Sequence, residues 1–82
     1  MPANPPARPD SEAELIEKAK RYLKQSYGED TVAMKVTRNT VTAGSGALAV
    51  DCTVSVGGHR SDWSKVFHFR GGAIAKMDYR RR

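Results

Sequence analysis

The chain is poor in the residues that cross-link small proteins or bind metals in them. It has one cysteine among 82 residues. A single thiol excludes an intramolecular disulfide, and it also excludes a multi-cysteine metal site of the zinc-finger kind. Cys52 stands between Val50 and Val54 in an alternating apolar pattern. We therefore predict a buried structural thiol at this position rather than a reactive one.

Long hydrophobic runs are absent as well. No stretch approaches the roughly 18 apolar residues that a membrane span needs, and Met1–Asp10 holds no apolar segment of the secretory-signal type. These absences predict a cytoplasmic protein with no membrane partner.

Catalytic and phosphate-binding motifs are also scarce. Gly44, Ser45 and Gly46 lack the lysine and the helix that would follow in a phosphate-binding loop. No serine stands in a nucleophile elbow. His59 and His68 are nine residues apart and are expected on unlike parts of the sheet, so they predict neither a metal site nor a catalytic pair. We therefore predict no catalytic residue, no metal and no cofactor.

The charge of the chain is unevenly placed. The net charge is +5, but residues 1–30 carry five basic and six acidic side chains, whereas residues 31–82 carry nine basic and three acidic ones. Such an excess could meet nucleic acid, an acidic protein or an anionic ligand, or it could simply form a solvated surface. The candidates for anion or nucleic-acid binding are Arg60, Arg70, Arg80, Arg81 and Arg82.

The N-terminal third divides into a tail and a helix. All four prolines lie within the first nine residues, so we expect residues 1–10 to form a disordered tail, residues 11–80 a single domain and residues 81–82 a basic end. Apolar residues at helical spacing predict a helix from Glu12 to Tyr27, with Gly28 just past its end. Ser11 and Glu14 have the spacing of a capping box.

The rest of the chain predicts strands joined by tight turns. A first strand is expected over Thr31–Thr37. Leu48–Val56, Arg60–Phe69 and Ala73–Tyr79 follow as three antiparallel strands joined by two diglycine turns, since glycine tolerates the positive φ of such turns. The fold class is therefore α+β: one N-terminal helix packed on a curved four-stranded antiparallel sheet, in the order α-β-β-β-β.

Two-residue turns set the strands in register and expose two candidate surfaces. The face predicted to pack on the helix comprises Leu48, Val50, Cys52, Val54, Trp63, Phe67, Phe69 and Ile74. Lys65, Lys76 and Asp78 fall on the same face, where an unpaired charge is costly. Either a β-bulge shifts the register, or these groups line the mouth of a concave pocket. The pocket candidates are Lys65, Lys76, Asp78, Trp63 and Tyr22.

The opposite face is expected to be apolar enough for a contact surface. Its members are Val66, His68, Ala75, Met77 and Tyr79. This surface predicts a homodimer or docking on another protein, with pairing through an edge strand as the competing arrangement.

The last hairpin resembles a known superfamily. Phe69, Gly72, Ile74 and Tyr79 match the terminal hairpin of the nuclear transport factor two-like superfamily, whereas Gly71 and Ala73 depart from its usual acidic and basic turn residues. One helix followed by four strands is similar to the smaller cystatin-like arrangement. The resemblance implies a curved sheet wrapped on a helix, and it transfers no catalytic residues.

These observations favour a small non-enzymatic binding module that self-associates through its sheet. Two alternatives stay open at this point: a small-ligand site or enzyme in the pocket between helix and sheet, and nucleic-acid binding through the basic half.

Overall fold

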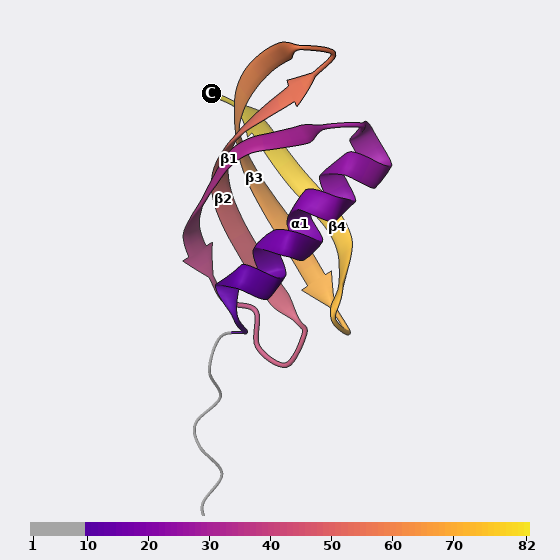
Figure 1. Ribbon diagram of the computed structural model, residues 1–82. Coiled ribbons are helices and arrows are strands. Elements are labelled where there is room, and N and C mark those ends of the chain that lie inside the picture. Colours follow the sequence, from indigo (N-terminus) through magenta and orange to yellow (C-terminus); the bar gives the residue numbers. More distant parts are fainter. Residues whose placement is uncertain (1–9) are drawn as a thin grey trace, which may run out of the picture.

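The computed structural model describes residues 10–82 and contains one helix and one sheet (Figure 1). The elements are α1 (Glu12–Tyr27), β1 (Asp30–Asn39), β2 (Gly46–Val56), β3 (His59–Arg70) and β4 (Ala73–Arg81). Neighbouring strands in the chain are neighbours in the antiparallel sheet, in the order β1-β2-β3-β4. The sheet is open, and α1 crosses one of its faces. The predicted α+β class and element order are confirmed.

The helix spans the predicted residues, but its N-terminus lacks the predicted side-chain cap. Leu15, Ala19 and Leu23 recur on one side of α1 and are buried against the sheet, as helical spacing requires. Gly28 ends the helix in the left-handed conformation, and its N–H donates to the Lys24 carbonyl. The predicted capping box does not form, because the side chain of Ser11 makes no capping hydrogen bond.

The centre of the sheet follows the predicted register. Strands β2 and β3 pair without interruption, from Gly46 opposite Phe69 to Val56 opposite His59 next to the Gly57-Gly58 turn. Alternate residues of both strands therefore face α1. The buried apolar residues are Leu15, Ala19, Leu23, Val41, Leu48, Val50, Cys52, Val54, Phe67 and Phe69. Trp63 and Ile74 are partly buried against this core, so the predicted core face is confirmed.

A β-bulge in the last hairpin changes the faces of β4. Phe69 pairs with Ile74 as expected, but His68 pairs with Lys76, so that Ala75 is the extra residue. A bulge of one residue exchanges the two faces for all that follow. Three charged residues were predicted on the core face, and a β-bulge was one of the two explanations for them. The bulge removes Lys76 and Asp78 from that face and leaves only Lys65 there.

The exchange corrects several predicted positions. Met77 pairs with Phe67, and Tyr79 pairs with Lys65, so both lie on the helix side rather than on the opposite face. Asp78 pairs with Val66 and lies on the open face with Lys76, not opposite Lys65.

The loop between β1 and β2 is fastened to the start of the described chain. The Asp10 carboxylate accepts hydrogen bonds from the N–H groups of Ala43 and Gly44, and the Asp10 N–H donates to the Val41 carbonyl. Asp10 is thus part of the fold, and β4 runs through Arg81. The remainder of the predicted tail, residues 1–9, lies outside the described residues.

Candidate functional site

A cleft of about 210 Å³ opens where the C-terminal end of α1 meets β3 and β4. Its lining residues are Tyr27, Glu29, Trp63, Lys65, Met77 and Tyr79. Three local features bring them together. Gly28 turns the chain at the helix end, β3 directs alternate residues towards α1, and the bulge at Ala75 directs Met77 and Tyr79 to the same side.

An ion pair lies at the base of this cleft. The ammonium Nζ of Lys65 donates to the Glu29 Oε1 at 2.7 Å, and the two side chains are only 3% and 14% exposed. The same Nζ lies 5.3 Å from the ring centroid of Trp63 and 5.8 Å from that of Tyr27. Aromatic faces attract cations at these distances. The buried ammonium group of Lys65 is therefore surrounded by a carboxylate and two aromatic rings, which offset the cost of its burial.

Aromatic side chains form the walls of the cleft. The rings of Trp63 and Tyr79 meet edge to face, 5.7 Å between centroids, and the Trp63 Nε1 donates to the Ser61 hydroxyl. Tyr27 is 47% exposed and Tyr79 is 62% exposed, so the walls are open to solvent. At the rim the Arg81 guanidinium lies 5.5 Å from the Trp63 ring centroid. We call Tyr27, Glu29, Trp63, Lys65, Met77 and Tyr79 the aromatic cleft.

The sequence found only part of this cleft. Lys65 and Trp63 were candidates and line it, whereas Lys76 and Asp78 lie on the other face of the sheet. Glu29 and Tyr27 were missed as site residues. The signal for Glu29 was the predicted burial of Lys65, since a buried ammonium requires a nearby acid. The position of Glu29 directly after the helix-ending Gly28 did not reveal which strand it would meet.

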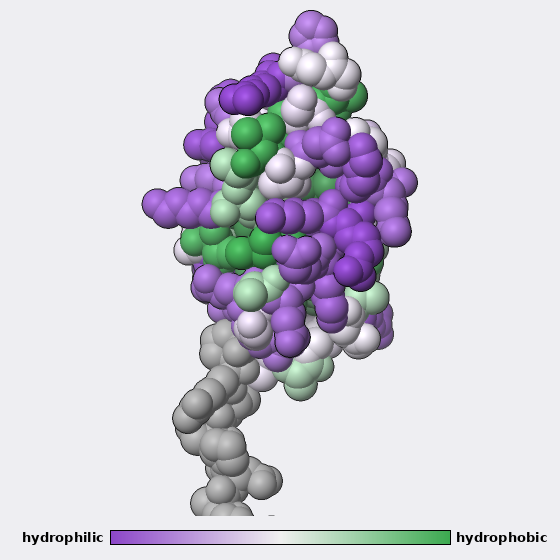
Figure 2. All heavy atoms as spheres, viewed as in Figure 1, coloured by the Kyte–Doolittle hydropathy of each residue, from purple (hydrophilic) through white to green (hydrophobic). Residues whose placement is uncertain are grey.

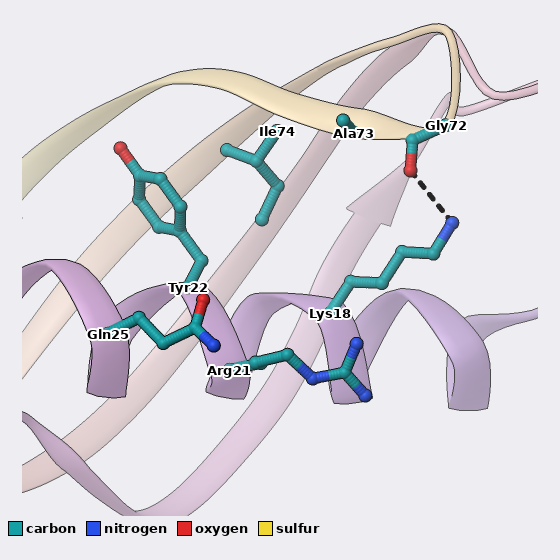
Figure 3. Close-up of a pocket in the computed structure, with 7 residues that line it drawn as sticks. All are labelled: Lys18, Arg21, Tyr22, Gln25, Gly72, Ala73 and Ile74. Carbon is teal, nitrogen blue, oxygen red and sulfur yellow. Dashed lines mark hydrogen bonds between the residues drawn. The ribbon is translucent and has the colours of Figure 1, made fainter.

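A second hollow lies beside the cleft, between α1 and the start of β4 (Figure 3). This groove of about 320 Å³ is lined by Lys18, Arg21, Tyr22, Gln25, Gly72, Ala73 and Ile74. The Lys18 Nζ donates to the Gly72 carbonyl at 2.8 Å, while the apolar side chain of Ile74 faces Tyr22.

Tyr22, a predicted pocket residue, therefore lines this groove and not the aromatic cleft. Its ring contacts that of Tyr27 with 6.0 Å between centroids, so this pair of rings stands between the two hollows. Burial raises the pKa of Tyr22, and the neighbouring Tyr27 adds to the increase.

The open face of the sheet is more polar than predicted. His68 Nε2 donates to the Asp78 Oδ2 at 2.8 Å, and the Ser64 hydroxyl donates to Asp51. The hydrogen bond from His68, with a smaller contribution from the charge of Lys76, lowers the pKa of Asp78. Lys65, which was predicted to share a face with Asp78, lies on the other side of the sheet. Met77 and Tyr79 lie on the helix side. Val66 is therefore the largest apolar side chain that remains on the open face among the residues predicted for it.

The basic candidates do not gather in one patch. Arg60 and Arg70 stand at opposite ends of β3, about 33 Å apart at the usual rise of a strand. Arg80 pairs with Ser64 on the open face, whereas Arg81 pairs with Trp63 on the helix side. Arg82 lies at the same end of the sheet, where its N–H donates to the Asp62 carbonyl.

Hydrophilic side chains cover most of the visible surface of α1, and hydrophobic surface shows only as smaller patches beside it (Figure 2). Within residues 10–82, no three His, Cys, Asp or Glu side chains are placed to hold a metal ion. The one helix in that range is not long and apolar enough to cross a membrane.

The fold and cleft define an α+β protein with an open four-stranded meander and a hollow between helix and sheet. Comparisons of the chain with protein-family models, with curated proteins and with solved structures each found no match.

Proposed function

We propose that the protein is a non-enzymatic binding module and that its ligand enters the aromatic cleft. The observation that carries this proposal is the Lys65–Glu29 ion pair, which is almost fully buried and lies beside the rings of Tyr27 and Trp63. A buried ion pair adds little net stability compared with packed apolar side chains. It is better explained as the polar group of a site with apolar walls, which is the usual composition of a ligand pocket.

The composition of the cleft favours binding over catalysis. Its only acid, Glu29, is engaged by Lys65, and neither serine, cysteine nor histidine lines it. A serine or cysteine nucleophile beside a histidine base, a common arrangement in covalent catalysis, is therefore lacking among the residues that line the cleft. Of the residues predicted from the sequence to line a pocket, Lys65 and Trp63 line the aromatic cleft, and this cleft takes the place of the open face as the proposed contact surface.

The single tryptophan of the chain makes the test direct, because Trp63 lies in the cleft. A panel of small aromatic and aliphatic compounds should include members that change Trp63 fluorescence saturably. Tyr79→Ala should weaken that response at least fivefold. Arg70→Ala, an exposed substitution at the far end of β3, is the control and should leave it unchanged. No saturable response from any compound would reject the aromatic cleft as a ligand site.

Self-association through the sheet is the second candidate function. The favouring observation is that the sheet is open, so that β1 and β4 each have one unpaired edge within the described residues. Such edges can pair with a second copy through backbone groups alone. Sedimentation equilibrium at micromolar concentration should then give the mass of a dimer, and a monomer mass would reject this candidate. A cytoplasmic location remains a prediction alongside both functions.

Nucleic-acid binding is less favoured by the geometry, because the basic candidates are divided between two ends and two faces of the sheet. A gel shift at low salt tests it, since such binding depends steeply on ionic strength. Failure to shift duplex or single strands at low salt would remove it.

A further inference from the structure

We infer that the ligand of the aromatic cleft is a small organic carboxylate with a single flat ring, whose carboxylate is received by Lys65 and Arg81. This inference rests on the proposed function, and it specifies the chemistry of the ligand. It depends on three features of the cleft: unused donors on Lys65, an excess of positive charge, and the size and shape of the walls.

The first feature is the donor capacity of Lys65. A lysine ammonium carries three N–H donors. Lys65 gives one of them to Glu29, and its Nζ makes no second hydrogen bond within residues 10–82. Its remaining neighbours there are the faces of Tyr27 and Trp63. A ligand oxygen would supply the acceptor that a buried ammonium lacks, and an ionised acceptor forms the stronger hydrogen bond.

The second feature is the balance of charge around the rings. Arg81 stands over Trp63 and forms no ion pair with any acid of the described chain. Lys65 and Glu29 line the cleft with one charge of each sign, and Arg81 adds a second positive charge at the Trp63 ring. An anionic ligand would balance this excess of positive charge, whereas a cationic ligand would be repelled by it.

The third feature is the space available. A cleft of about 210 Å³ is smaller than the roughly 300–1,000 Å³ of pockets for drug-sized ligands, which excludes nucleotides and long acyl chains from full burial. The rings of Tyr27 and Tyr79 and the side chain of Met77 are among the groups that line it. Aromatic rings pack well edge to face or offset against such walls. Tyr27 is the last residue of α1 and is half exposed, so one wall of the cleft is reached directly from solvent.

The test uses three probes of the same shape and different charge: benzoate, benzamide and benzylamine. Binding is followed by Trp63 fluorescence and by amide chemical shifts of the full chain. We expect benzoate to bind at least tenfold more tightly than benzamide, and benzylamine to bind most weakly. Acetate, which has the carboxylate without the ring, should bind at least tenfold more weakly than benzoate.

Two variants connect this preference to the named residues. Lys65→Met should reduce the advantage of benzoate over benzamide to less than twofold. Because that variant leaves Glu29 without its partner, a change in stability must be separated from a change in binding, and Arg81→Gln is the second variant. The Arg81 side chain is exposed, and its replacement should weaken the binding of benzoate severalfold without weakening that of benzamide. Lys20→Gln, an exposed substitution on α1 outside the cleft, is the matched control and should change neither affinity.

The outcomes separate this inference from the proposed function. If benzamide or benzylamine binds as tightly as benzoate, the carboxylate assignment is wrong, while the aromatic cleft remains a ligand site. If acetate binds as tightly as benzoate, the ring requirement is wrong. If Arg81→Gln leaves the affinity for benzoate unchanged, Arg81 does not receive the carboxylate. If none of the probes and none of the wider compound panel binds, both the inference and the proposed function fail.

Discussion

The Lys65 ammonium of β3 and the Glu29 carboxylate that follows α1 are 36 residues apart in the chain and 2.7 Å apart in the structure. The pair fastens the end of the helix to the middle of the sheet. Because Lys65 is 3% exposed, Glu29 is the group that compensates its buried charge. One ion pair therefore joins the end of the helix to the sheet, and both of its members line the aromatic cleft.

Removing one member of this pair should cost more stability than removing both. Glu29→Ala leaves the Lys65 charge buried without a partner, and we expect a loss of about 3 kcal/mol in the free energy of unfolding. Glu29→Leu combined with Lys65→Met should lose less than Glu29→Ala does, because no unpaired charge remains. Urea unfolding of the single and double variants measures both values. A double variant less stable than Glu29→Ala would contradict this account of the pair.

Phe67 should be the most sensitive apolar position of the sheet. Its ring is fully buried at 0% exposure and contacts Tyr22 edge to face. Phe67→Ala removes a buried ring and leaves a cavity, so we expect a loss of roughly 3–5 kcal/mol. Tyr79→Ala, at a position 62% exposed, should cost less than about 1 kcal/mol. Comparable losses for the two variants in thermal or urea unfolding would show that the core is placed incorrectly.

The Cys52 thiol should be unreactive in the folded protein. It is 1% exposed, and burial raises its pKa above the ordinary value of 9.0. Iodoacetamide at pH 8 should therefore modify the protein in urea but not under native conditions. Because the pKa of Cys52 is higher in the folded than in the unfolded protein, the unfolded thiol ionises first as the pH rises. Cys52 therefore does not lower the free energy of unfolding below pH 9.0, and it lowers that energy progressively as the pH rises from 9.0 to the pKa of the folded state. Cys52→Ala should lack this alkaline loss, and rapid native alkylation would contradict the burial.

Two glycines with positive φ should respond differently to a methyl group. At Gly46, with a φ of 139°, an added Cβ would collide with the backbone of Thr40 and with the Cα of Val41 at 2.8 Å. At Gly57, with a φ of 57°, an added Cβ has no neighbour within 4 Å. Gly57→Ala should therefore cost only the left-handed strain, about 1–2 kcal/mol, and Gly46→Ala clearly more. Equal melting temperatures for the two variants would count against the close approach of Thr40 and Gly46.

Local patterns in the sequence were sufficient for the elements. Apolar residues at helical spacing up to Gly28 determine α1, and strict alternation of apolar and polar residues around Cys52 determines β2. Apolar side chains gather on one face of an element only when their spacing matches its period. The Gly57-Gly58 turn likewise determines the β2–β3 register, since two residues leave one way to pair the strands. The burial of Lys65 on the helix side follows from the same alternation.

The tertiary structure decided which groups meet. The bulge at Ala75 leaves no local signature, since it depends on how β4 fits beside β3, and it moves Met77 and Tyr79 to the helix side and Asp78 away from Lys65. Glu29 reaches Lys65 only because α1 crosses the sheet at the angle that places its end over β3. A one-residue change of register or a rotation of the helix costs little in local propensity but exchanges whole faces. The aromatic cleft is therefore a product of packing, whereas the helix and strands that form it follow from the local sequence.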